Sequence, residues 1–474
     1  MNNEWSQNSA YHPYRSQSLP IMKNLYLKYK PHYRDNLKLA VPVIISQLGH
    51  TLVQTSDSII VGHFSGTISL AAVSLVNSIF VLPMVIGLGI SYGLTPLIAQ
   101  HNGRKEFAAC GKLLANSLFI NIISSIILFS GLYFGSVYVL NHLHQSPAVV
   151  IQAKPYLFLL GSSIIPMLIY NTFKQFAEGL GFTKQAMVIS ISGNILNVIL
   201  GIIFVKGMFG IAPMGIKGVG YSTLIDRCLM AIVMGFYVFR AQKFKVYLKG
   251  FTINSINYIR GLKIMQIGTP VALQYTFELS AFSGAALLIG TIGPIQQAAH
   301  QVAINLAAIT YMISSGVGAA ATIRAGNYYG VKDHDKLRSS AISSYHIVIV
   351  IMCGTALLFS LGNNLLPYIY TTDKNVIAFA AQLLIIAAVF QLFDGAQVVG
   401  LGILRGMGDV NIPTFITFLA YWVVGLPVGY YLGMHLNWGA QGIWCGLVLG
   451  LLVSAVLLFF RFQFMSKRYR YQAV

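Results

Sequence analysis

The sequence predicts an all-α integral membrane protein with twelve transmembrane helices in two six-helix lobes. Three observations lead to this fold class. Of the 474 residues, 56% are hydrophobic and only 9% are charged, apolar runs long enough to cross a bilayer recur twelve times, and the two halves of the chain resemble each other. A helix needs about 20 residues to cross the bilayer, whereas the strands of a barrel are shorter and alternate in polarity.

The predicted spans follow one another with short connections. They are 37–63, 68–98, 112–140, 151–178, 186–208, 217–240, 264–290, 296–324, 338–368, 376–404, 411–434 and 440–464. The longest connection, 241–263, is basic and separates an N-lobe (37–240) from a C-lobe with a basic C-terminal tail (264–474). Residues 1–36 contain no signal-peptide pattern, so we expect them to form a cytoplasmic tail.

The net charge of +19 agrees with this topology. Of the 31 Lys and Arg residues, 26 fall in the tails and connections of one side and four in those of the other side. The positive-inside rule then predicts that both termini are cytoplasmic. Because the basic residues lie in membrane-flanking loops, the charge indicates membrane lipid as a partner and not nucleic acid.

An internal repeat relates the two halves. Gly89 and Gly103 recur 227 positions later as Gly316 and Gly330, and Pro42 recurs 228 positions later as Pro270. Since six crossings return the chain to its starting side, the halves are parallel repeats about an axis along the membrane normal. Two such bundles suit alternating access around a central cavity.

The first span carries a polar row on one helical face. The spacing of this row is 3, 4 and 3 residues, and its members are Gln47, His50, Gln54 and Asp57. A charge within the bilayer is costly and is therefore a functional candidate by default. We predict that Asp57 binds the coupling ion or proton and that the other three residues face the substrate cavity.

Two further acidic residues lie in the C-lobe spans. Glu278 follows Gln274 by one turn, and Asp394 follows Gln391 by three residues, so each carboxylate has an amide on about the same face. We predict that both acids take part in cation or proton coupling. The two glutamines are candidate supporting ligands.

Neutral oxygens in the fifth and sixth spans are candidate ligands beside Asp57. They belong to Asn194, Asn197 and Thr223. Interhelical hydrogen bonding is the alternative role of these three residues. For the acids themselves, the alternative is a structural ion pair with a basic side chain.

Two of the remaining acids are expected to be structural. Asp226 is expected to form an interhelical salt bridge, with a role in transport as the alternative, and Arg227 is the one basic residue deep in a span. Lys174 and Glu178 are expected to form an exposed pair near a helix end.

Aromatic side chains near the C-lobe acids are candidates for the wall of a drug cavity. They are Tyr275, Phe282 and Phe393, which could accept flat cations by stacking and cation–π contact. Packing or lipid contact is the alternative for each ring. The sequence contains no phosphate-binding G-x-x-x-x-G-K-[ST] loop, no metal-spaced cluster and no nucleophile motif. We therefore expect no cofactor and no enzymatic activity.

Four segments resemble the multidrug and toxic compound extrusion (MATE) family in its NorM-like branch. They are QLGHTLVQTSDSIIVG from Gln47, AAHQVAIN from Ala298, GVGAAATIRAG from Gly316 and QLFDGAQVVGLGILRGMGD from Gln391. The resemblance covers nearly the whole chain after residue 36. It implies a multidrug efflux antiporter of a bacterial plasma membrane that exports amphipathic organic cations in exchange for Na+ or H+.

The resemblance also implies site residues. By this resemblance, Asp57 corresponds to the family's carboxylate in the first helix. Glu278 and Asp394 correspond to the acids of a C-lobe cation site that could hold Na+. Two positions depart from the family pattern. Phe390 stands where many NorM-like members have tyrosine, and Gly201 stands where related proteins often have Asp or Asn.

Three rival functions remain at this point. A flippase for lipid-linked substrates would share the two-lobed architecture but would need a cavity rich in Lys and Arg. A membrane enzyme would need a catalytic motif. A channel would conduct without countertransport. No soluble interface is visible in the sequence, and we expect the chain to work as a monomer.

Overall fold

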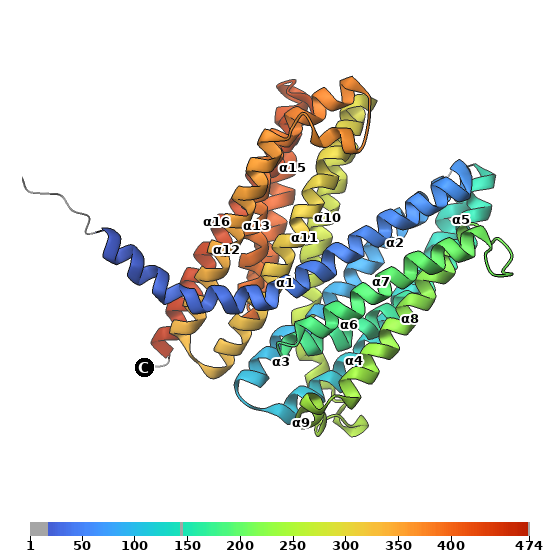
Figure 1. The fold of residues 1–474 in the computed structure, drawn as a ribbon. Helices are drawn as coiled ribbons and strands as arrows, with labels where there is room; N and C mark the ends of the chain where they lie inside the picture. The colour runs from blue at the N-terminus through green and yellow to red at the C-terminus, as the bar shows by residue number, and fades with distance from the viewer. Residues whose placement is uncertain (1–17, 143–145, 473–474) are drawn as a thin grey trace, which may run out of the picture.

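The computed structural model describes the backbone of residues 18–142 and 146–472, and within these ranges it contains helices and no strand. Two helical bundles form a V that is open at one end and closed at the other (Figure 1). The predicted fold class is confirmed.

The N-lobe contains eight α-helices. They are α1 (Ser18–Phe64), α2 (Gly66–Tyr92), α3 (Leu94–Gly103), α4 (Phe107–His142), α5 (Pro147–Ser162), α6 (Ile164–Gly179), α7 (Thr183–Lys206) and α8 (Ile216–Arg240). The connection to the C-lobe contains η1 (Gln242–Phe244), α9 (Lys245–Leu248) and η2 (Ile253–Ser255).

The C-lobe continues from α10 to the end of the described chain. Its elements are α10 (Tyr258–Ile292), α11 (Pro294–Val331), α12 (His334–Leu361), η3 (Leu366–Ile369), α13 (Lys374–Gly406), α14 (Asn411–Phe418), η4 (Leu419–Gly425), α15 (Leu426–Tyr430), η5 (Tyr431–His435) and α16 (Gly439–Gln472). Segments η4 and η5 are π-helical.

Eleven helical segments of the described chain are long and apolar enough to span a membrane. The twelfth predicted span lies in α1, whose apolar run is interrupted by the polar row that ends at Asp57. Helix α1 begins well before that span, at Ser18, and residues 1–17 lie outside the described chain.

Proline explains why two predicted spans are broken helices. The span 68–98 divides into α2 and α3 at Gly93, and the span 151–178 divides into α5 and α6 at Ser163. Pro96 and Pro166 each follow the break by three residues. Since proline has no N–H, the carbonyl four residues before it loses its helical hydrogen bond, which weakens the helix at this point.

The internal repeat extends to the backbone conformation. Lys105 and Lys332, which are 227 residues apart, both have a left-handed φ, at 61° and 62°. Gly181 and Gly408, at the same offset, have φ of 85° and 81°. Each pair follows the end of corresponding helices, so the two lobes repeat their turns as well as their helices.

The first helix of each lobe packs against the other lobe. Helix α1 contacts α11 and α12 as well as α7, and α10 contacts α2, α3 and α4. The beginning of α1 is anchored on the C-lobe by an ion pair of 2.9 Å between Asp35 and Arg324 and by a hydrogen bond of 2.9 Å from Asn36 to the Ser344 hydroxyl.

Glycine permits close backbone contacts at the closed end of the V, where α3 and α11 meet. A Cβ on Gly103 would lie 2.3 Å from the carbonyl oxygen of Asn327, and a Cβ on Gly330 would lie 2.1 Å from that of Gln100. These contacts are related by the 227-residue offset, so the lobe interface itself has pseudo-twofold symmetry.

Candidate functional site

Three neighbouring cavities lie between and within the lobes, and Gln47 and Tyr92 line all three. The C-lobe cavity, of about 360 Å³, is lined by Glu278, Asp394 and mostly apolar residues. The N-lobe cavity, of about 230 Å³, contains Asp57 and more polar groups. A small cavity of about 50 Å³, here called the lower cavity, contains Arg405.

The C-lobe cavity brings two of the predicted acids together. Glu278 on α10 and Asp394 on α13 are both buried, with 8% and 2% of their surfaces exposed. The Tyr421 hydroxyl donates to Oε1 of Glu278 over 3.5 Å, and Gln397 donates to Tyr421 over 2.9 Å. Oδ1 of Asp394 has no hydrogen-bond partner.

Among the described residues, no basic side chain forms an ion pair with either Glu278 or Asp394. A buried carboxylate without a partner is strongly disfavoured as an ion. The pair is therefore suited to hold a proton or a small cation.

The two predicted supporting glutamines differ in their surroundings. Gln391 is fully buried, and neither atom of its amide has a partner. Gln274 donates to the Thr414 hydroxyl over 2.9 Å and lines the lower cavity, where Arg405 lies 3.4 Å from its carbonyl oxygen. Gln274 and Glu278 thus line the same lower cavity, and the amide of Gln274 is engaged by Thr414 and Arg405.

The N-lobe cavity collects the polar residues expected near Asp57. Asn194 and Asn197 from α7 and Thr223 from α8 line it together with Asp57 from α1. Asn197 donates to the Thr223 hydroxyl over 3.3 Å. Oδ1 of Asp57, Oδ1 of Asn197 and Nδ2 of Asn194 are buried without partners. The arrangement leaves both oxygen acceptors free for a guest.

The prediction of a salt bridge for Asp226 is wrong, because none of the described basic side chains forms an ion pair with it. Asp226 lines the N-lobe cavity, and its Oδ1 has no partner. Arg227 instead donates to the Ser163 hydroxyl over 2.6 Å, and its guanidinium lies 5.3 Å from the centre of the Phe80 ring. Adjacent positions on a helix point about 100° apart, which separates the two side chains.

The expectation of an exposed Lys174–Glu178 pair is also wrong. The two charged groups lie 4.0 Å apart, but both side chains are buried. Lys174 lines both the N-lobe cavity and the lower cavity, and it donates to the Ser46 hydroxyl over 3.3 Å. Helices α8, α4 and α3 pack against α6, which no pattern within α6 could indicate.

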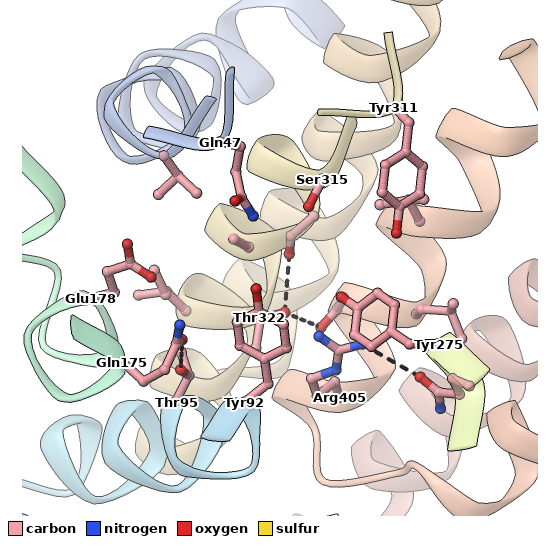
Figure 2. Close-up of a pocket in the computed structure, with 18 of the residues that line it drawn as sticks. Gln47, Tyr92, Thr95, Gln175, Glu178, Tyr275, Tyr311, Ser315, Thr322 and Arg405 are labelled. Carbon is pink, nitrogen blue, oxygen red and sulfur yellow. Dashed lines mark hydrogen bonds between the residues drawn. The ribbon is translucent and has the colours of Figure 1, made fainter. Parts of the chain in front are cut away.

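The lower cavity adjoins the two larger cavities, with which it shares Gln47 and Tyr92. Figure 2 shows Glu178 and Gln175 on one side of it and Arg405 with Tyr275 on the other. The Arg405 guanidinium lies 5.8 Å from the Tyr275 ring centre. Sequence reasoning placed Arg405 in a cytoplasmic connection and did not include it in the site.

The structure places four of the predicted cavity side chains along the cavities. Gln47, His50, Tyr275 and Phe282 line the cavities, whereas the side chain of Gln54 lies outside the described part of the chain. Phe393 instead packs against a buried apolar cluster of the C-lobe. The additional wall residues that sequence reasoning missed include Tyr92, Tyr311, Met312 and Phe390.

Comparison with known proteins gives consistent sequence matches. A family model described as MatE matches the chain twice, over residues 42–203 and 270–431. The multidrug resistance protein MdtK of Pectobacterium atrosepticum is 32% identical over 450 residues, which cover 93% of this chain and 97% of that protein. The multidrug resistance protein NorM of Vibrio parahaemolyticus is 32% identical over 446 residues, with 93% and 97% covered.

Solved structures share the fold. A eukaryotic MATE transporter superposes with a TM-score of 0.84 at 19% identity, over 94% of this chain and all of the other. A multidrug resistance MATE family transporter in an outward-facing conformation also gives 0.84, at 20% identity over 94% and 99% of the two chains. The two family matches begin 228 residues apart, which is the offset between Pro42 and Pro270.

Proposed function

Because the chain belongs to the MatE family, as its motifs predict, we propose that it is a multidrug efflux antiporter that exchanges amphipathic organic cations for Na+ or H+ by alternating access. The membrane-spanning helices and the bacterial relatives support a multi-pass protein of a bacterial membrane. No comparison favours a flippase. Transport in this proposal needs no cofactor and no chemical turnover.

One observation carries the proposal. Glu278 and Asp394 are buried in a largely apolar cavity between the lobes, and no described basic side chain forms an ion pair with either of them. A carboxylate in such a place needs a positive guest. Since the drug and the coupling ion satisfy the same negative charge, binding of one disfavours binding of the other.

The cavity wall suits an amphipathic cation. Tyr275, Phe282, Tyr311 and Phe390 line the C-lobe cavity around Glu278. Aromatic faces attract a cation within about 6 Å and also cover the apolar parts of the guest. This wall supports organic cations as the substrate class, and the carboxylate of Glu278 selects a guest that carries positive charge.

The proposed orientation follows from the positive-inside rule. The connection from α8 to α10, where six of the basic residues lie between 240 and 263, is at the closed end of the V (Figure 1). If this end faces the cytoplasm, both termini are cytoplasmic and the V opens outward. The described conformation is then the one that releases drug and takes up the coupling ion.

The coupling ion remains to be assigned between sodium and protons. Phe390 supplies no oxygen ligand, but the Tyr421 hydroxyl bonds to Glu278 from another helix. A sodium ion would find the two carboxylates, this hydroxyl and water as hard oxygen ligands. A proton would need only one carboxylate. The protein is proposed to work as a monomer with membrane lipid around it.

Proteoliposomes loaded with a fluorescent organic cation test the proposal. A sodium jump and a pH jump, applied separately, are each compared for dye efflux from liposomes with the intact chain. We expect at least one gradient to drive efflux and Asp394→Asn and Glu278→Gln each to abolish it. Asp373→Asn is the matched control, because this exposed carboxylate caps α13 and lies outside the cavities, and asparagine also caps helices. If neither the sodium gradient nor the pH gradient drove dye efflux, the antiport mechanism would be refuted.

A further inference from the structure

The N-lobe cavity contains a second buried carboxylate besides Asp57. Asp226 reaches this cavity from α8 with 4% of its surface exposed. Oδ1 of Asp226 and Oδ1 of Asp57 both lack hydrogen-bond partners, and so does Oδ1 of Asn197. Three acceptor oxygens from α1, α7 and α8 thus face one polar cavity without a donor.

A glycine on α7 makes room for the Asp226 carboxylate. A Cβ on Gly193 would lie 2.6 Å from Oδ1 of Asp226, closer than any side chain could approach. The carboxylate therefore lies against the α7 backbone, next to Asn194 and one turn from Asn197. Any larger residue at position 193 would displace it.

The two basic residues of the N-lobe cavity have bonding partners other than Asp226. Arg227 is held by Ser163 and by the Phe80 ring, and Lys174 is held by Glu178 and Ser46. Within the described chain, Asp226 forms no ion pair with either base. A buried, unpaired carboxylate is costly unless a cation or a proton compensates it.

We propose that Asp226 is a second carboxylate ligand of the N-lobe cation site and shares one monovalent cation, sodium or a proton, with Asp57. This inference rests on the proposed antiport function. It also accounts for Gly201, which leaves no side chain on α7 one turn after Asn197. The second acid comes instead from the neighbouring helix α8.

The two basic groups limit the charge of the guest. With both acids ionised, and with Lys174 paired to Glu178, Asp57 and Asp226 face one further basic side chain, Arg227, among the residues that line the N-lobe cavity. One positive charge on the guest then neutralises the cavity, whereas a divalent ion would leave one uncompensated positive charge in a low-dielectric place. The site therefore favours a monovalent ion.

The test uses the full chain in nanodiscs with Glu278→Gln and Asp394→Asn present, so that the C-lobe acids are removed. Binding of radioactive sodium is measured in one experiment, and the release of protons on addition of tetraphenylphosphonium is measured in another. The two readouts distinguish sodium from a proton as the bound ion. In this background, Asp226→Asn and Asp57→Asn should each weaken sodium binding by roughly tenfold or more, or abolish the released proton. Asp373→Asn should change neither.

The double variant Asp57→Asn/Asp226→Asn distinguishes a shared ion from a structural effect. If both acids hold one ion, the loss of affinity in the double variant is smaller than the product of the two single losses, since the two carboxylates act on the same ion. Asp226→Glu should keep the ion and shows that the chain folds with a carboxylate at this position.

Two results would overturn the assignment. Wild-type-like binding in Asp226→Asn together with a loss in Asp57→Asn would exclude Asp226 while leaving the antiporter intact. Binding that neither variant changes would mean that the N-lobe holds no coupling ion. The proposed function itself fails only if the C-lobe variants, made in the otherwise intact chain, also leave gradient-driven efflux unchanged.

Discussion

The substitution Gly330→Ala tests whether the closed end of the V holds the described conformation. The added Cβ would lie 2.1 Å from the carbonyl oxygen of Gln100, whereas ordinary contacts begin at 3.4 Å. Because that oxygen belongs to the backbone of α3, no side-chain rotation relieves the clash, and α3 and α11 must separate by roughly 1 Å. Overpacking of this kind costs about 1–3 kcal/mol.

The free energy of this overpacking destabilises only the conformation in which α3 and α11 are in contact at the closed end of the V. If alternating access opens the same end, the ratio of the two conformations shifts by about 5- to 150-fold toward the other state. The shift is measured by double electron–electron resonance between spin labels at Met208 and Leu365, which are exposed at the open ends of the N-lobe and C-lobe. The four native cysteines are replaced first.

We expect a shorter distance between the labels to gain population in Gly330→Ala. Gly354→Ala is the control, since a Cβ on this α12 residue meets no atom within 4 Å. An unchanged distance distribution in Gly330→Ala, with unchanged thermal stability, would refute the reasoning about the closed end.

Three further predictions concern single side chains. Phe390→Tyr adds a hydroxyl to the C-lobe cavity and should strengthen sodium-driven dye efflux relative to proton-driven efflux; an unchanged ratio would show that this oxygen does not reach the ion. Trp444→Phe removes an N–H that donates to buried His300 over 3.1 Å and should lower the stability by about 1–3 kcal/mol in thermal unfolding, whereas full stability would mean that His300 finds another donor. His32 lies before the predicted span of α1, and burial and then the Arg324 guanidinium hold its pKa below the ordinary 6.5. The stability from neutral His32 is therefore present above pH 6.5 and lost as the pH falls below it, and His32→Gln should reduce this loss.

Hydropathy, charge and repeat were sufficient to predict the fold class. Backbone groups in lipid must be satisfied within the helix, so long apolar runs allow few other structures. The repeat from Gly89 to Gly316 also predicted the parallel lobes. The breaks at Gly93 and Ser163 were missed, although Pro96 and Pro166 were visible in the sequence.

Where one helix face carries the predicted residues, the structure places them along a cavity. Gln47, His50 and Asp57 share a face of α1, and all three line a cavity. Phe393 is adjacent to Asp394 and points about 100° away from it, against an apolar cluster, whereas Phe390, one turn before, shares the face of Asp394 and lines the C-lobe cavity.

Groups that meet only through tertiary packing were not predictable from the sequence. Lys174 is near the end of its predicted span, and a position near a span end normally indicates exposure. Its burial depends on the helices packed against α6, chiefly α8, α4 and α3, and Ser46 of α1 accepts a hydrogen bond from it. In the same way, the hydroxyl of Tyr421 reaches Glu278 from a π-helical segment distant in sequence.

The central claim is that a drug and a coupling cation compete for the same buried carboxylates. Binding of tetraphenylphosphonium to the purified chain, measured by calorimetry over a series of sodium concentrations and pH values, tests it most directly. Competition predicts that the apparent Kd rises in proportion to the coupling cation, and that this dependence disappears in Glu278→Gln and Asp394→Asn. A drug affinity that is the same at every sodium concentration and pH would contradict the account.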